Sequence, residues 1–212
     1  MAFQLADQNP AMSDMDRLMQ LYWALSSTLL HRIEGAVVEL GCNAGLTTVW
    51  LQQIICDFEP GRELHAFDSF EGMPDPGISD HFLLPGNSRV ERSLLEMNFR
   101  RWRLPLPKIH EGWFHETLVK SCIGKIAFAY LDSDFYRSTM ESLEFTYPRL
   151  SPGGVILIDD YCDLSANPRS WDRLPGVKKA CDEYFHELGQ EVDVLAGYGE
   201  LSLAAVRKPL DD

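Results

Sequence analysis

The stretch Ala36-Val-Val-Glu-Leu-Gly-Cys-Asn-Ala-Gly45 joins a short β-branched run to the beginning of a helix. Residues 36–40 predict a strand, and the spacing of apolar residues over 45–57 predicts a helix. Gly41 and Gly45 allow a tight turn and let a ligand approach the backbone closely. The first amides of the helix favour an anionic group. The spacing is not that of the dinucleotide fingerprint, which disfavours a nucleotide-dependent oxidoreductase.

Strand-like and helix-like segments alternate on both sides of this stretch, which predicts an α/β fold with a mostly parallel sheet. Helices are predicted over 13–33, where Ser13 can serve as the cap, and over 88–102, 139–149 and 175–188. Strands are predicted over 63–67, 108–110, 126–131 and 155–158. Residues 192–195 and 201–206 resemble a closing hairpin, so the last strand is expected to be antiparallel.

The chain has 212 residues and a net charge of -13, with 45% hydrophobic residues. This length predicts a single domain, 1–212, since domains typically hold ~100–200 residues. The acidic balance disfavours nucleic acids and anionic membranes as partners. The beginning of the chain shows no signal peptide, and five scattered cysteines show no zinc spacing. We therefore expect a cytoplasmic protein.

Acidic residues follow two neighbouring strands: Asp132 and Asp134 after the strand at 126–131, and Asp159 and Asp160 after the strand at 155–158. Adjacent strands lie ~4.8 Å apart, so these carboxylates can converge. Unpaired, they would raise one another's pKa, and a hard cation such as Mg²⁺ or Mn²⁺ would remove that conflict. Helix capping is the alternative role for some of them.

Three further segments follow strands at the edge where open α/β sheets bind ligands. Asp68 could accept ribose hydroxyls or cap the turn that follows it. In Glu111-Gly-Trp-Phe-His115, an aromatic ring could pack on adenine or belong to the core. Residues 71–107 are rich in glycine and proline and predict a lid or insertion over the site, whereas 1–35 form an N-terminal helical segment. The apolar face of residues 15–30 could serve a partner subunit in a homodimer.

Several strings together resemble one known family. These are Phe67-Asp-Ser-Phe-Glu-Gly-Met-Pro74, Glu111-Gly-Trp-Phe-His-Glu-Thr-Leu118, Leu131-Asp-Ser-Asp-Phe-Tyr-Arg-Ser-Thr139, Tyr147-Pro-Arg-Leu-Ser-Pro-Gly-Gly154 and Ile158-Asp-Asp-Tyr161. In this order, they resemble the macrocin O-methyltransferase family (TylF/MycF-type), over about residues 37–185. The resemblance implies a Rossmann-like class I methyltransferase fold with a seven-stranded sheet. It also implies transfer of a methyl group from S-adenosyl-L-methionine to a hydroxyl, leaving S-adenosyl-L-homocysteine, with Mg²⁺ or Mn²⁺ as a cofactor.

The resemblance also implies roles for individual residues. Asp132, Asp159 and Asp160 would be the metal ligands, and Asp134 the general base. The donor would be held by a set spread over four strand ends: Glu39, Gly41, Asn43, Gly45, Thr47, Asp68, Ser69, Gly112, Trp113, Phe114, His115, Asp132 and Ser133. The acceptor would be a small molecule, a sugar or another natural-product intermediate.

The sequence departs from the family pattern at Ser133, where the family usually has glycine, in a glycine loop that is poorer in glycine, and in a short segment before Val37. These departures affect the acceptor more than the donor. The alternatives are a metal-independent or N-directed methyltransferase of the same fold, and a non-catalytic binding protein. Convergent carboxylates disfavour the last, because a scaffold has no need of them.

Overall fold

One sheet of seven strands, in the order β3-β2-β1-β4-β5-β7-β6, runs through the computed structural model, which describes residues 1–9 and 14–210. Its strands are β1 (Ala36–Leu40), β2 (Leu64–Asp68), β3 (Lys108–Glu111), β4 (Ile126–Leu131), β5 (Leu150–Asp159), β6 (Asp193–Leu195) and β7 (Leu203–Arg207). The first five are parallel to one another, and β7 is antiparallel to both β5 and β6. The predicted sheet with an antiparallel last strand is confirmed.

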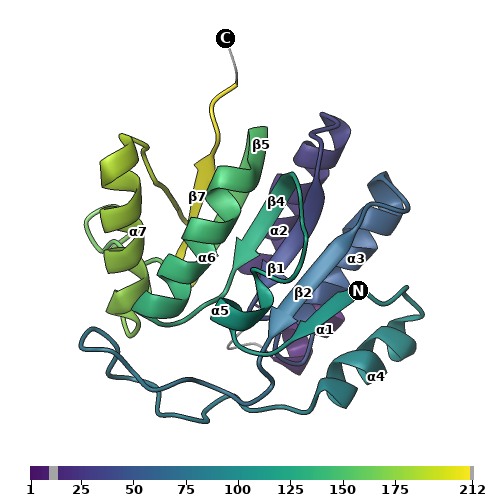
Figure 1. Ribbon diagram of the computed structural model, residues 1–212, viewed down its shortest axis with the longest axis horizontal. Helices are drawn as coiled ribbons and strands as arrows, with labels where there is room; N and C mark the ends of the chain where they lie inside the picture. The colour runs from purple at the N-terminus through teal and green to yellow at the C-terminus, as the bar shows by residue number, and fades with distance from the viewer. Residues whose placement is uncertain (10–13, 211–212) are drawn as a thin grey trace.

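Helices cover both faces of the sheet (Figure 1). The bounds of the helices are α1 (Ala2–Gln8), α2 (Met15–Leu30), α3 (Leu46–Phe58), α4 (Arg92–Trp102), α5 (Phe114–Thr117), α6 (Tyr136–Arg149) and α7 (Pro175–Leu188). Phe128 and Tyr130 of β4 pack in the core with α2 and α3, whereas Ala129 and Leu131 pack with α6 and α7. This alternation is what a strand buried on both faces requires, and it explains why β4 is apolar throughout.

Some element boundaries differ from the sequence-based expectations. Helix α6 begins at Tyr136, three residues before the predicted start, because its first turn is held from outside the helix, as described below. The predicted cap Ser13 lies outside the described residues, and Asp14 accepts a hydrogen bond from the Arg17 amide (3.0 Å) at the beginning of α2. Strand β5 begins at Leu150, which lies opposite Ile126 of β4, and its register shifts before Val155 lies opposite Phe128.

The register of the central strands aligns their carboxyl ends. Leu40 of β1 lies opposite Phe67 of β2 and Leu131 of β4, and Leu131 lies opposite Ile158 of β5. The residues that follow this row therefore emerge at one edge of the sheet: Gly41, Asp68, Asp132 and Asp159. The sheet thus places side chains from four segments beside one another.

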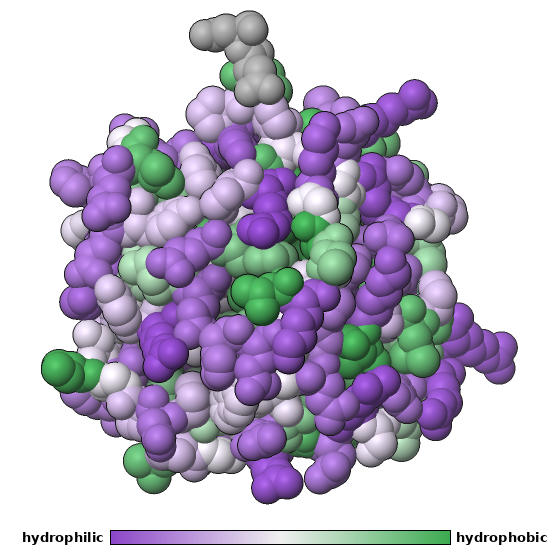
Figure 2. Space-filling model, viewed as in Figure 1, coloured by the Kyte–Doolittle hydropathy of each residue, from purple (hydrophilic) through white to green (hydrophobic). Residues whose placement is uncertain are grey.

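The molecular surface in the view of Figure 1 is mostly hydrophilic, with hydrophobic residues in small separate groups (Figure 2). This agrees with the net charge of -13. Within residues 1–9 and 14–210, no helix combines the length and apolarity that crossing a bilayer would need.

A histidine pair makes the stability of this sheet depend on pH. His65 of β2 is buried, and its Nδ1 lies 2.9 Å from Nε2 of His110 on β3, which stacks on Phe67. Burial lowers the pKa of both imidazoles, that of His110 to about 4. In the unfolded chain, both imidazoles bind protons near the ordinary histidine pKa of ~6.5. Because the folded protein binds these protons only at lower pH, protonation favours the unfolded chain. The free energy of unfolding should therefore decrease as the pH falls from 7 towards 4.

We predict that His110→Gln makes the free energy of unfolding less dependent on pH between 7 and 5. Urea denaturation at four pH values measures this slope. The control is His81→Gln, which changes an exposed imidazole and should leave the slope as in the parent protein. An unchanged slope in His110→Gln would contradict the account of the pair.

Candidate active site

The turn from β1 into α3 requires glycine at two positions. A Cβ at Gly41 would lie 1.8 Å from the carbonyl oxygen of Asp132, and φ is +94° there. Gly45 has φ +75°, and a Cβ there would lie 2.6 Å from Cγ of Leu95 on α4. The two glycines therefore let the loop pass directly against the carboxyl end of β4, so that the glycine loop and the acidic residues share one site.

A cavity of about 790 Å³ lies beyond this edge of the sheet. Most of the residues predicted to bind the donor line it: Gly41, Asn43, Asp68, Ser69, Gly112, Trp113, Phe114, His115, Asp132 and Ser133. The predicted base Asp134 lines it too. Glu39, Gly45, Thr47, Asp159 and Asp160 lie outside the lining. The cavity therefore joins the ends of four strands, as their register requires.

Residues 71–91, called the lid loop here, form the outer wall of the cavity. Met73, Pro74, Pro76, Pro85 and Ser88 are among its lining residues. The wall meets the glycine loop where Asn43 Nδ2 donates a hydrogen bond to the Ser88 carbonyl (2.7 Å). The predicted lid region thus contains a loop placed across the cavity, followed by α4.

Asp68 connects the glycine loop with the end of β2. Its Oδ2 accepts a hydrogen bond from the Asn43 amide (2.8 Å), and its Oδ1 accepts one from the Phe70 amide (2.7 Å). Burial raises the pKa of this carboxyl, while these two amides oppose the rise. Both roles expected for Asp68 are compatible with this position, since it caps the following turn and also lines the cavity.

Ser133 is held in place by α6. Its Oγ lies 2.9 Å from Oγ of Ser142, which donates a hydrogen bond to the Ser138 carbonyl (2.7 Å). The serine that replaces the usual glycine of the family at position 133 is therefore accommodated by a buried polar contact with α6. On the other side of the cavity, Trp113 and Phe114 are half-buried at the start of α5 and form part of the wall.

Glu39 is a buried acid directly behind the glycine loop. It is 1% exposed, and its Oε2 has no hydrogen-bond partner. Burial, reinforced by the charge of Asp68, raises the pKa of this carboxyl to about 8. Buried polar groups normally have partners, so this unpartnered oxygen indicates a place where a bound group would be stabilised.

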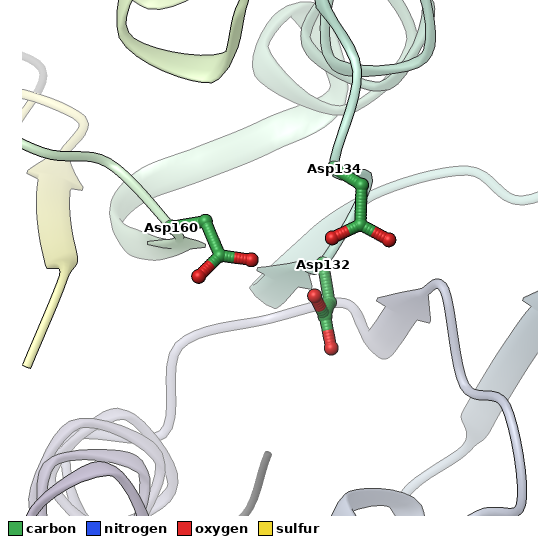
Figure 3. A group of neighbouring side chains, drawn as sticks. All are labelled: Asp132, Asp134 and Asp160. Carbon is green, nitrogen blue, oxygen red and sulfur yellow. The ribbon is translucent and has the colours of Figure 1, made fainter. Parts of the chain in front are cut away.

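Three carboxylates come together at the ends of β4 and β5. One oxygen each from Asp132, Asp134 and Asp160 lie within 4.8 Å of one another, and the three side chains lie side by side (Figure 3). Asp134 and Asp160 have left-handed backbones, with φ of +58° and +56°. Non-glycine residues adopt this conformation at a cost, so the structure holds both carboxyls in place against local strain.

Burial and mutual repulsion dominate the electrostatics of this cluster. Burial, together with the charge of Asp159, raises the pKa of Asp134 to about 7. The same causes raise the pKa values of Asp132 and Asp160 well above their ordinary value. Oxygen ligands of this kind suit Mg²⁺ or Mn²⁺, and a divalent cation would offset the repulsion, so these residues fit a metal.

Asp159 occupies a different environment from the other three acids. Its Oδ1 accepts a hydrogen bond from Arg17 Nε (2.7 Å), and its Oδ2 accepts one from the Tyr130 hydroxyl (2.6 Å). Arg17, from α2, also pairs with Asp14. The predicted metal set was Asp132, Asp159 and Asp160, whereas the three acids gathered here are Asp132, Asp134 and Asp160. Arg17 and Tyr130 engage both oxygens of Asp159 in this structure.

Sequence reasoning missed Arg17 and the contribution of α6. Arg17 is 7% exposed. Burial alone would lower the pKa of its guanidinium, but the charges of Asp159 and its neighbours raise it. An arginine on the otherwise apolar face of a predicted helix was the available signal. Arg137, Ser138 and Glu141 of α6 also line the cavity; the first two lie in the family string that begins at Leu131, but no role was predicted for them.

Comparisons with known proteins agree with this geometry. The model of the macrocin O-methyltransferase family (TylF) matches residues 6–192, and the chain belongs to this family. The structure of the O-methyltransferase NovP is similar, with a TM-score of 0.81 and 24% identity, over 94% of this chain and 82% of that one. The expected class I methyltransferase fold is thereby confirmed.

Two curated relatives have more specific names. An 8-demethyl-8-(2,3-dimethoxy-alpha-L-rhamnosyl)-tetracenomycin-C 4'-O-methyltransferase from Streptomyces olivaceus is 32% identical over 161 residues, covering 71% of this chain. The mycinamicin III 3''-O-methyltransferase from Micromonospora griseorubida is 30% identical over 186 residues, covering 82% of this chain. The chain spans 62% and 69% of the lengths of these relatives.

The pairing of Arg17 with Asp159 predicts a large effect on stability. Arg17→Met would leave a buried carboxylate without its cation, and we expect the free energy of unfolding to fall by about 3–5 kcal/mol. Urea denaturation measures the difference. The control is Lys179→Met on α7, which breaks an exposed pair with Glu183 and should have a much smaller effect, because water screens an exposed pair. Equal losses in the two variants would contradict the importance of the buried pair.

Proposed function

We propose that this protein transfers the methyl group of S-adenosyl-L-methionine to a hydroxyl of a small molecule, with a divalent metal ion as a cofactor. The observation that supports this most strongly is the group of half-buried carboxylates at the ends of β4 and β5, two of which line the cavity beside the glycine loop. Membership of a family of O-methyltransferases supports the same reaction.

The donor would lie in the part of the cavity that is bounded by the glycine loop, Asp68 and α5. When bound, it supplies an electrophilic methyl group on a sulfonium. Asp68 would accept hydrogen bonds from the ribose hydroxyls. Each of its carboxylate oxygens accepts one backbone amide and has a second lone pair for a hydroxyl. Trp113 and Phe114 offer aromatic surface to the adenine. Glu39 has an unpartnered oxygen that would accept a hydrogen bond from the ammonium of the methionine part, and this positive charge would in turn lower the raised pKa of the carboxyl.

A metal ion would be held by Asp132 and Asp160, which belong to both the predicted and the observed sets of acids. Asp159 is proposed as the third ligand, for which it would have to share its oxygens with Arg17 and Tyr130. When bound, the ion lowers the pKa of a coordinated hydroxyl. Arg17 offsets part of the negative charge of these acids in the absence of the ion.

Asp134 would act as the general base. It lines the cavity, and its pKa of about 7 is in the range that favours proton transfer near neutral pH. In the proposed step, Asp134 accepts the proton of the acceptor hydroxyl while the oxygen forms a bond to the methyl carbon. The carbon–sulfur bond breaks, and S-adenosyl-L-homocysteine leaves as a neutral thioether.

The acceptor is proposed to be a sugar or another natural-product intermediate. The names of both curated relatives describe methylation of an oxygen on natural products of this kind, one of which carries a rhamnosyl group. Glu71 and Glu141 in the cavity lining offer polar contacts for a polyhydroxylated molecule. We further propose that the protein acts in the cytoplasm and forms a homodimer.

The role of Asp134 can be separated from that of a metal ligand. We predict that Asp134→Asn lowers turnover at least about 100-fold, within the range of general-base catalysis. Its affinity for S-adenosyl-L-homocysteine and for Mn²⁺, measured by calorimetry, should remain within about threefold of the parent. Turnover is measured as S-adenosyl-L-homocysteine formed with a panel of glycosylated acceptors, mycinamicin III among them. Loss of Mn²⁺ binding would instead identify Asp134 as a ligand.

Metal dependence has its own test. We predict that EDTA abolishes turnover, that Mg²⁺ or Mn²⁺ restores it, and that Asp160→Asn prevents the restoration. Asp57→Asn, on the exposed end of α3, is the control and should behave as the parent does. Full activity in EDTA would favour the metal-independent alternative, and failure of the parent to bind S-adenosyl-L-homocysteine would favour a non-catalytic protein.

A further inference from the structure

The base of the lid loop is fixed by hydrogen bonds. The Met73 amide donates to the Asn87 carbonyl (2.8 Å), and the Gly86 amide donates to the Met73 carbonyl (2.9 Å). Together with the bond between Asn43 and Ser88, these contacts attach both ends of the loop to one side of the cavity. The middle of the loop must therefore be held by something else if it is to stay across the opening.

Asp80 holds the middle of the lid loop against α6. It is only 3% exposed although it belongs to an irregular surface loop. Its Oδ1 accepts a hydrogen bond from the amide of Tyr136, the first residue of α6 (3.1 Å), and its Oδ2 accepts one from the Gly77 amide (3.2 Å). No side chain at the N-cap, Phe135, caps this helix, so Asp80 supplies the cap from the loop. In Figure 1 the loop passes beneath α6 and α7.

The beginning of helix α7 also contacts the Asp80 carboxylate. A Cβ at Gly176, in the first turn of α7, would lie 2.0 Å from Asp80 Oδ1 and 2.8 Å from the Tyr136 nitrogen. Beside it, Phe82 meets Trp171 edge-on, with ring centroids 5.3 Å apart. The glycine thus leaves the space that the carboxylate fills, and the beginnings of two helices contact the same loop residue.

Apolar contacts hold this part of the loop less firmly. The side chains of Ile78 and Leu84 are 95% and 64% exposed, so they contribute little burial, and only the partly buried Leu83 between Asp80 and Leu84 packs against the core. A loop of this kind opens easily unless polar contacts restrain it. The carboxylate of Asp80 is the buried polar anchor between these two residues.

We propose that Asp80 is a positioning residue that latches the lid loop over the donor half of the cavity. This rests on the proposed function, because the latch would act by retaining the bound donor. When the latch is released, the outer wall formed by Met73–Gly77 and Pro85–Ser88 moves away from Asp68 and α5. The donor then dissociates faster, and the affinity for it falls, while the residues at the strand ends keep their places.

Limited proteolysis and ligand binding test the latch with four variants. Asp80→Ala removes both acceptors, and Asp80→Asn keeps Oδ1 for the Tyr136 amide. Gly176→Ala displaces the Asp80 carboxylate while the amino-acid sequence of the lid loop stays unchanged. Ile78→Ser is the control, two residues away in the same loop and outside the cavity lining. Thermolysin cleavage within residues 71–91 is followed by mass spectrometry without ligand, well below the unfolding temperature. Calorimetry gives the Kd for S-adenosyl-L-homocysteine.

We expect Asp80→Ala and Gly176→Ala to be cleaved about tenfold faster than the parent and to bind S-adenosyl-L-homocysteine about tenfold more weakly, as the loss of a buried acceptor implies. Asp80→Asn should lie between them and the parent, and Ile78→Ser within about twofold of the parent. Equal cleavage and equal Kd in Asp80→Asn, Gly176→Ala and Ile78→Ser would overturn the latch, even if Asp80→Ala fails to fold. A parent that does not bind the ligand would contradict the proposed function, and the cleavage rates would still decide the latch.

Discussion

Repulsion among closely spaced, partly buried carboxylates is the constraint on which this site depends. The register of β1, β4 and β5 brings Asp132, Asp159 and Asp160 to one edge of the sheet, and the loop after β4 adds Asp134. Taking these charges out of water is costly unless they are protonated or paired. Arg17, from α2, offsets part of the charge, while burial and the neighbouring acids raise the pKa values of Asp132 and Asp160 well above their ordinary value. The divalent cation proposed above would offset the remaining negative charge.

The remaining parts of the site are arranged around this edge. Gly41 brings the loop after β1 against Asp132, and Asp68 ties that loop to the end of β2. The lid loop is attached to the same loop through Asn43 and to α6 through Asp80. Helix α6 begins directly after the segment that carries Asp134. The proposed donor, metal and base sites are therefore connected through short hydrogen-bonded contacts between neighbouring loops.

The sequence predicted the sheet well because its signals are local. The apolar run at 126–131 and the glycines at 41 and 45 mark a buried strand and a turn whose geometry depends on neighbouring residues. The acids at the strand ends were predictable for the same reason, since parallel strands end at one edge. Arg17 and Asp80 were not, because each acts on a partner more than 50 residues away. The register of the sheet does not determine where α2 packs against β5 or where the lid loop meets α6.

The distinction between Asp159 and Asp134 shows the same limit. Adjacent strands predict that all four acids are close, but they do not predict which oxygen faces which neighbour. Asp159 follows the alternation of β5 onto the face that α2 covers, where Arg17 and Tyr130 meet it. Asp134 lies beyond the strand, and a left-handed backbone turns it back towards Asp132. Local backbone conformation and a distant helix thus decide the grouping.

Anomalous diffraction from crystals grown with Mn²⁺ and S-adenosyl-L-homocysteine tests the central claim most directly. The account predicts an anomalous peak within coordination distance of Asp132 and Asp160, with the ligand between Asp68 and α5. A fully occupied ligand with no anomalous peak at these carboxylates, at Mn²⁺ concentrations that support turnover, would contradict it.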